Sequence, residues 1–115
     1  MQTLFFEDAW KKTISPHDRK NIQTAFDETN IGDDVTISYL WEAKNHVNAL
    51  LVTTLIHNGT DKPLNLENIN IRYQTRVGSF TVPLAIPAYH SMPWTFIFDG
   101  NGMDEAADYV ITVDE

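Results

Sequence analysis

Four histidines are the side chains best suited to hold a metal ion or to move a proton: His17, His46, His57 and His90. No two of them stand at i, i+2 or i, i+4, the spacings that place two side chains on one face of a strand or a helix. We therefore interpret them as surface or turn residues. The chain has no cysteine, which excludes a thiolate zinc site and a disulfide scaffold. We predict no metal and no cofactor.

The patterns that support nucleophilic or acid–base catalysis are missing. Ser91 follows His90 directly, but neighbouring residues of an extended chain point to opposite sides. The Gly-x-Ser-x-Gly elbow of serine hydrolases does not occur. Two pairs of acids, Asp33-Asp34 and Asp104-Glu105, fall in predicted loops, where solvated charges are the usual case. We predict that the protein is not an enzyme and has no catalytic residues.

The stretch from Ile86 to Phe98 is the most unusual part of the chain, because it gathers prolines, aromatic residues and a methionine. Its second half alternates like a strand, and we expect Trp94, Phe96 and Phe98 to face the core. Exposed aromatic and methionine side chains in the loop before it are typical of a protein-binding patch. The candidate protein-binding loop contains Tyr89, His90 and Met92.

One helix is predicted over residues 16–28. Ser15 is a favourable N-cap, and Asp18 stands three residues later, where a carboxylate suits the positive end of the helix dipole. Ile22 and Phe26 recur at helical spacing, so they form an apolar face that packs on the rest of the fold.

After the helix the hydrophobic period changes to two, which predicts strands. They are expected around residues 35–41, 47–56, 69–73, 80–84, 94–98 and 109–113. In the first of them Val35, Ile37, Tyr39 and Trp41 alternate with other residues and should share one face. The second is apolar on both faces for part of its length, as in a central strand.

Short strands at regular spacing without helices between them favour an antiparallel arrangement. We predict a mainly β fold, an immunoglobulin-like antiparallel β-sandwich with one N-terminal α-helix. A length of 115 residues corresponds to one domain, residues 1–115.

The net charge is −8, from 16 acidic and 8 basic residues. Such a surface repels phosphate backbones, so no nucleic-acid partner is expected. Six acids and no lysine or arginine lie between Asp99 and Glu115, which we interpret as a solvated acidic segment. A calcium loop starting at Asp99 is disfavoured because Met103 takes the fifth ligand position.

The N-terminus lacks the basic start and longer apolar run of a signal peptide. No stretch approaches the roughly 20 apolar residues of a membrane span. We therefore expect a cytoplasmic protein without a membrane span.

The chain resembles the SLAP-domain family over roughly residues 8–98. The matching features are Trp10 before a helix opened by Ser15, a long apolar strand running into Asn58-Gly59-Thr60-Asp61-Lys62-Pro63, and the ending Ile86-Pro87-Ala88 with Ser91 and Pro93-Trp94-Thr95-Phe96-x-Phe98. The ending is the most specific of these features.

The resemblance implies a non-enzymatic accessory role in the secretion or assembly of surface-layer (S-layer) proteins in Gram-positive bacteria of the Bacillus type. In that family the domain occurs, often in duplicate, in S-layer assembly proteins of an accessory Sec system. A location peripheral to the membrane translocase is implied with it. The family defines no catalytic residues, so none carry over. A single copy is present here.

Three hypotheses follow. The first is a protein-binding module whose partner is a secreted S-layer precursor or an accessory secretion component, with homodimerisation through an exposed edge strand as a further route to assembly. The second is a carbohydrate- or cell-wall-binding sandwich in which Trp41 or Tyr89 stacks on sugar rings. The third is an enzyme with His46 or His57 beside a carboxylate in a pocket.

Overall fold

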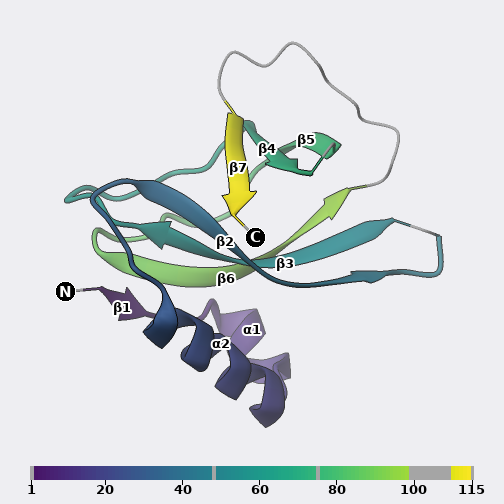
Figure 1. The fold of residues 1–115 in the computed structure, drawn as a ribbon, viewed down its shortest axis with the longest axis horizontal. Helices are drawn as coiled ribbons and strands as arrows, with labels where there is room; N and C mark the ends of the chain where they lie inside the picture. The colour runs from purple at the N-terminus through teal and green to yellow at the C-terminus, as the bar shows by residue number, and fades with distance from the viewer. Residues whose placement is uncertain (1, 48, 75, 99–109, 115) are drawn as a thin grey trace.

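The fold combines one curled sheet with two short helices, in a computed structural model that describes residues 2–47, 49–74, 76–98 and 110–114 (Figure 1). In chain order the elements are β1 (Thr3–Leu4), α1 (Asp8–Thr13), α2 (Pro16–Glu28), β2 (Val35–Lys44), β3 (Leu50–Asn58), β4 (Ile69–Tyr73), β5 (Arg76–Phe80), β6 (His90–Phe98) and β7 (Val110–Asp114). The predicted helix over 16–28 is confirmed at both ends. The helix α1 was not predicted.

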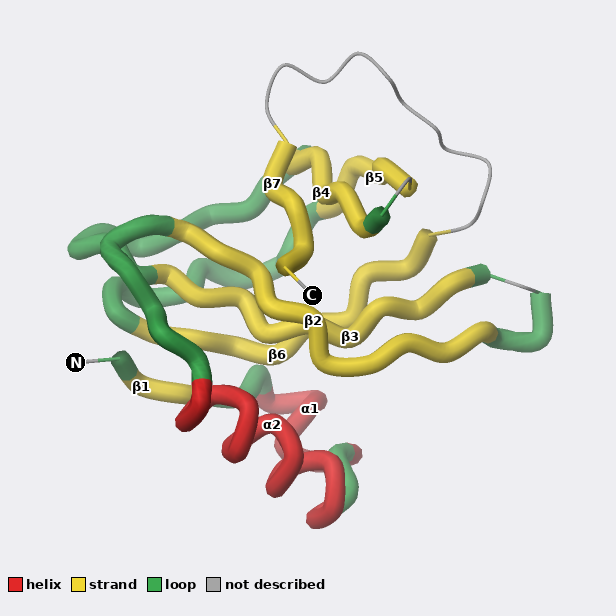
Figure 2. Tube along the Cα trace, viewed as in Figure 1, coloured by secondary structure: helices red, strands yellow, loops and turns green. Residues whose placement is uncertain are grey.

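The seven strands of the described residues form one sheet with the order β1-β6-β3-β2-β7-β4-β5. The pairs β2–β3, β3–β6 and β4–β5 are antiparallel, whereas β1–β6, β2–β7 and β4–β7 are parallel. In Figure 2 the strands β2, β3 and β6 form a middle layer, β7, β4 and β5 curl over one face of it, and α1 and α2 cover the other face. The position of β3 between β2 and β6 confirms the predicted central strand.

The predicted mainly β class is therefore confirmed. The predicted antiparallel sandwich is not, because three of the strand pairs are parallel. The last strand β7 inserts between β2 and β4 and runs parallel to both, which joins the two halves into one mixed sheet. Pairing between segments so distant in sequence leaves no trace in the alternation or the spacing of the strands along the chain.

Two strand boundaries also differ from expectation. The strand expected around 80–84 is wrong beyond Phe80, because β5 spans Gly78 and ends at Phe80, and residues 81–85 form no strand. Strand β6 begins at His90, within the predicted loop. A proline inside β6 is tolerated because Pro93 pairs with Leu55 on one side, while on its other side β1 pairs only as far as Ser91. Along this part of β6 no described strand needs the missing N–H of Pro93.

The larger of two hydrophobic clusters fills the space between the middle layer and the curled half of the sheet. It includes the fully buried Ile37, Ile56 and Ile71. Phe80 meets Phe96 and Phe98 edge to face, with ring centroids 5.0 and 5.1 Å apart. Aromatic pairs of this geometry link the end of β5 to β6 across the core.

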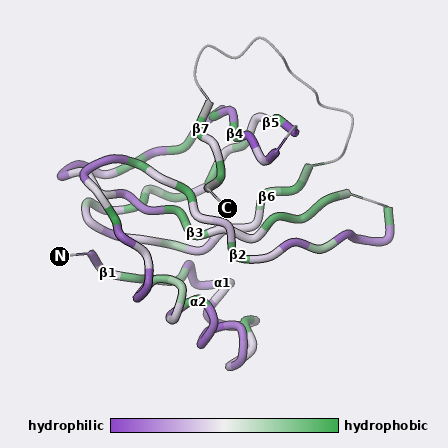
Figure 3. The backbone as a smooth tube through the Cα atoms, viewed as in Figure 1, coloured by the Kyte–Doolittle hydropathy of each residue, from purple (hydrophilic) through white to green (hydrophobic). Residues whose placement is uncertain are grey.

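The smaller cluster fixes the helices to the opposite face of the sheet. Its buried members are Phe6, Ile22 and Leu55, and Phe26 packs against them. Most other residues of α2 are hydrophilic, as the hydropathy colours along the backbone in Figure 3 show. The predicted apolar face of this helix is thereby confirmed.

The Asn58-Gly59 turn at the end of β3 is a buried anchor for the loops around it. Asn58 is inaccessible to solvent. Its Nδ2 shares two hydrogens among the carbonyl oxygens of Lys62, Ile86 and Pro87 at 2.8, 3.0 and 3.1 Å. Its Oδ1 accepts from the main-chain N–H and the hydroxyl of Thr60. One side chain thus holds two loops that are distant in sequence.

Candidate functional site

The predicted binding loop divides into one exposed and one buried part. Tyr89 is 44% exposed and lies in the left-handed region with φ of 57°. His90 is half-buried, packs edge to face on Phe5 at 5.5 Å, and its Nδ1 donates to the carbonyl oxygen of Ala88 at 2.8 Å. Met92 is fully buried in the larger core cluster.

The surface position expected for Met92 is therefore wrong. Because β6 begins at His90, its alternation already points Met92 inward, on the same face as Trp94 and Phe96. The period-two pattern that correctly placed the aromatic residues after Pro93 would have placed Met92 as well, had it been extended two residues toward the N-terminus.

His57 was expected at the surface or in a turn, and it is instead fully buried in β3. Its Nδ1 lies 2.7 Å from the Ser91 hydroxyl and its Nε2 lies 3.0 Å from the Ser38 hydroxyl. Gln2 donates its amide Nε2 to the same Ser91 oxygen at 3.2 Å. Burial lowers the pKa of His57 from its ordinary value of 6.5 to about 4. At neutral pH the ring is therefore neutral and part of an enclosed polar cluster.

This cluster pairs a serine with a histidine, the combination that activates a nucleophile in hydrolases. Both side chains have no exposed surface, and the histidine ring bonds to a second serine rather than to a carboxylate. Nothing outside the protein reaches the Ser91 hydroxyl in this arrangement. The cluster satisfies buried polar groups between β2, β3 and β6.

Within the described ranges, no group of three or more His, Asp or Glu side chains is placed to hold a metal ion. The acids Asp99, Asp104, Glu105, Asp108 and Glu115, and with them the calcium-like segment, lie outside the described residues.

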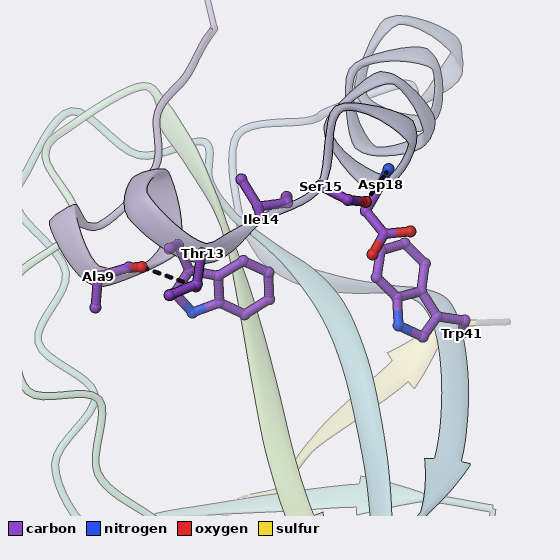
Figure 4. A pocket seen from close by; sticks show the side chains of 7 residues that line it. Ala9, Thr13, Ile14, Ser15, Asp18 and Trp41 are labelled. Atoms are coloured by element: carbon purple, nitrogen blue, oxygen red, sulfur yellow. Dashed lines mark hydrogen bonds between the residues drawn. The ribbon is translucent and has the colours of Figure 1, made fainter.

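A largely apolar pocket of about 480 Å³ opens between the two helices and β2. It is lined by Ala9, Trp10, Thr13, Ile14, Ser15, Asp18 and Trp41. Figure 4 shows Ala9 and Thr13 on the α1 side, and Ser15, Asp18 and Trp41 on the other side. Two tryptophans and one acid from three separate elements thus converge on one concavity.

The α1 wall of the pocket depends on a helix of six residues that begins after Glu7. The Glu7 carboxylate caps it by accepting from the main-chain N–H groups of Ala9 and Trp10 at 2.8 and 3.3 Å. The N–H of Ile14 closes its other end on the carbonyl oxygen of Trp10. The two caps hold Trp10 and Ile14 against the smaller core cluster.

Trp41 reaches the pocket because of a β-bulge. The register between β2 and β3 shifts between Tyr39 and Trp41, where Tyr39 pairs with Thr54 and Trp41 with Thr53. The extra residue, Leu40, reverses the alternation, so that Tyr39 packs in the larger cluster and Trp41 against the helices. The expectation that Trp41 shares a face with Tyr39 is therefore wrong, and the bulge re-aims the side chain that completes the pocket.

Asp18 supplies the charge of the pocket. The Ser15 hydroxyl accepts from its main-chain N–H at 3.1 Å, the N-cap contact that the sequence predicted. This contact fixes the first turn of α2, and Figure 4 shows the carboxylate directed toward Trp41. The side chain is half-buried. Sequence reasoning identified the role of Asp18 in the helix but not its place in a pocket, since the partner tryptophans come from other elements.

The fold and the site define a small, mainly β domain that carries an aromatic pocket on its helix-covered face. The family model of the SLAP domain matches residues 4–109. Since the match covers nearly the whole chain, the chain belongs to the SLAP-domain family. The match extends beyond residues 8–98 on both sides and ends just before β7.

No curated protein and no solved structure matches the chain. Neither α1 nor α2 is long and apolar enough to cross a bilayer, and the other described residues contain no helix that is.

Proposed function

We propose that the chain is a non-enzymatic protein-binding module, accessory to the secretion or assembly of bacterial surface-layer proteins. Membership of the SLAP-domain family supports the link to an accessory Sec system and to S-layer proteins. The proposal includes an S-layer precursor or an accessory secretion component as the partner, and a site of action in the cytoplasm near the translocase of a Gram-positive bacterium.

The observation that carries the binding role is the pocket between α1, α2 and β2. Its two tryptophans are half-buried and stand on capped or paired elements. Tryptophan is among the residues that most often dominate the energy of an interface, because a large rigid ring loses little entropy on binding. The pocket is therefore a better candidate than the loop, where Tyr89 is exposed, His90 is half-buried and Met92 is buried.

Trp41→Leu is expected to weaken binding of a purified S-layer precursor by roughly tenfold, the loss typical of an interface anchor. Leucine keeps an apolar contact with the helices, so the fold is retained, which circular dichroism checks. Isothermal titration calorimetry of wild type, Trp41→Leu and Tyr89→Ala measures the effect, and Tyr89→Ala is expected to bind like wild type.

Two results would go against this proposal in different ways. A wild-type chain that binds neither a precursor nor an accessory secretion component contradicts the proposed function. Loss of binding in Tyr89→Ala together with full binding in Trp41→Leu moves the site to the loop around Tyr89 and rejects the pocket.

A second candidate function is binding of cell-wall carbohydrate, since indole rings also stack on sugars and Trp41 lines a pocket with an acid. Titration with peptidoglycan fragments and chitooligosaccharides, followed by tryptophan fluorescence, distinguishes the two functions. We expect no saturable change. A saturable change that disappears in Trp41→Leu would favour the carbohydrate function.

Assembly of two copies through a sheet edge is also part of the proposal. The carbonyl oxygen of Ser91 faces β1, where it accepts from Phe5, so by alternation the main-chain groups of Thr95 and Ile97 face the same edge beyond the end of β1. Strand addition there would pair them. Sedimentation velocity tests this: a concentration-dependent dimer is expected, and a monomer at all concentrations contradicts it.

A further inference from the structure

We infer that the pocket lined by Trp10, Trp41 and Asp18 binds a positively charged side chain, a lysine or arginine, of the partner protein. This inference rests on the proposed function, since it names the chemistry of the group that the binding module recognises. It concerns the occupant of the pocket, whereas the proposed function concerns which protein is bound.

The aromatic walls favour a cation over an anion. Tryptophan is the aromatic side chain that attracts a cation most strongly, because the face of the indole carries negative potential. Two tryptophans line this pocket. The net charge of −8 adds a long-range attraction for basic segments and a repulsion for acidic ones.

The Asp18 carboxylate favours a cation over a neutral apolar group. It is the charged side chain among the lining residues, and a neutral occupant would remove water from the carboxylate without replacing the lost interactions. A lysine or arginine would supply hydrogen-bond donors and the opposite charge in the same place. Its aliphatic stem would lie along Ala9 and Ile14.

Arg19, the arginine next to Asp18 in sequence, does not neutralise this carboxylate. Arg19 follows Asp18, but its guanidinium carbon lies 4.9 Å from the centre of the Phe6 ring. Within the described part of the chain, the Asp18 carboxylate forms no ion pair and no hydrogen bond. The pocket thus presents a carboxylate whose main chain is fixed by the helix cap and which has no partner among the described residues.

The probe we would use is an acetylated, amidated peptide of alternating glycine and lysine, compared with the same peptide carrying Nε-acetyl-lysine. The readout is the indole N–H signals of the three tryptophans in two-dimensional NMR spectra of the full chain. The signals of Trp10 and Trp41 are expected to shift with the lysine peptide, while that of Trp94, which packs against the larger core cluster, stays in place.

Asp18→Asn is expected to weaken binding of the lysine peptide about threefold, within the range of a solvent-accessible ion pair. Trp41→Leu is expected to weaken its binding roughly fivefold, within the range of a cation–π contact. Glu28→Gln is the matched control, because it removes one negative charge at the exposed far end of the same helix. It should bind the peptide like wild type. An arginine peptide should shift the same two signals.

Three results would overturn the inference. Equal binding of the lysine peptide and the Nε-acetyl-lysine peptide would show that the pocket does not select a cation. Equal binding of the lysine peptide by Asp18→Asn and wild type would show that the carboxylate takes no part. Shifts at Trp10 and Trp41 with chitooligosaccharide and none with the lysine peptide would assign the pocket to sugars.

The precursor titration of the same variants keeps this inference separate from the proposed function. If Trp41→Leu loses the precursor but no basic peptide shifts the indole signals, the module binds its partner through the pocket by other chemistry, and only the inference fails. If the lysine peptide binds as expected but no precursor or secretion component does, the proposed function fails and the cation site stands.

Discussion

Gly59→Ala is expected to destabilise the protein by about 3 kcal/mol or more, at the upper end of the range for overpacking. A Cβ at this position would lie 2.0 Å from the carbonyl oxygen of Gly32 and 2.9 Å from that of Asp34. Both are main-chain atoms, and the N–H of Gly59 donates to the Asp34 oxygen at 3.0 Å. The two segments cannot separate without breaking this hydrogen bond.

The matched control for this change is Gly32→Ala, because a Cβ at Gly32 meets nothing within 4 Å. Its stability should stay within about 0.5 kcal/mol of wild type or rise slightly, since alanine restricts the unfolded chain. Urea denaturation of the three proteins gives the comparison. Equal stability of Gly59→Ala and Gly32→Ala would mean that the close approach of these loops is not part of the native structure.

Acidification is expected to remove about 2 kcal/mol of stability between pH 7.5 and pH 5, and about 3 kcal/mol by pH 4, through His57 alone. The folded protein holds this ring neutral, with its pKa lowered from 6.5 to about 4 by burial. Below pH 6.5 the unfolded chain therefore binds a proton that the folded chain does not. The stability contributed by the neutral ring is fully present above that pH and is lost as the pH falls.

His57→Gln isolates this effect, because glutamine does not titrate. The variant is expected to be less stable at neutral pH, since it changes a buried cluster with Ser38 and Ser91, but its free energy of unfolding should depend less on pH between 7.5 and 5. His17→Gln is the matched control, because it removes an exposed histidine of α2 that lies outside this cluster. Parallel curves for wild type and His57→Gln would show that His57 titrates normally in the folded state.

Local signals predicted the parts of the fold that depend on a few consecutive residues. The helix over 16–28 was found because Ser15 and Asp18 are capping residues, and Ile22 and Phe26 repeat at helical spacing. The capping contact and the apolar face involve residues at most a few positions apart. For that reason they could be recognised without knowledge of the rest of the structure.

Features that depend on distant segments could not be predicted in this way. The β-bulge at Leu40 turns Trp41 toward the helices, but no distinctive residue in the sequence marks it. Strand β7 was expected as a strand, but its parallel insertion between β2 and β4 follows from tertiary packing. The pocket combines both effects, because Trp10, Asp18 and Trp41 meet only after the bulge and the two helix caps have formed.

Burial of single polar residues was the other source of error. His57 is polar and stands near a turn signal, so a surface position was the natural expectation. It is buried because the hydroxyls of Ser38 and Ser91, from strands on either side of β3, satisfy both ring nitrogens. Only the strand register brings these three residues together.

Hydrogen exchange measured by mass spectrometry, with and without a purified S-layer precursor, tests most directly whether the chain binds its partner through the pocket. We predict slower exchange in peptides covering residues 8–18 and 38–44, which carry the pocket walls, and unchanged exchange in peptides covering 86–92. Protection confined to residues 86–92, with no change around Trp10 and Trp41, would contradict the assignment of the binding site to the pocket.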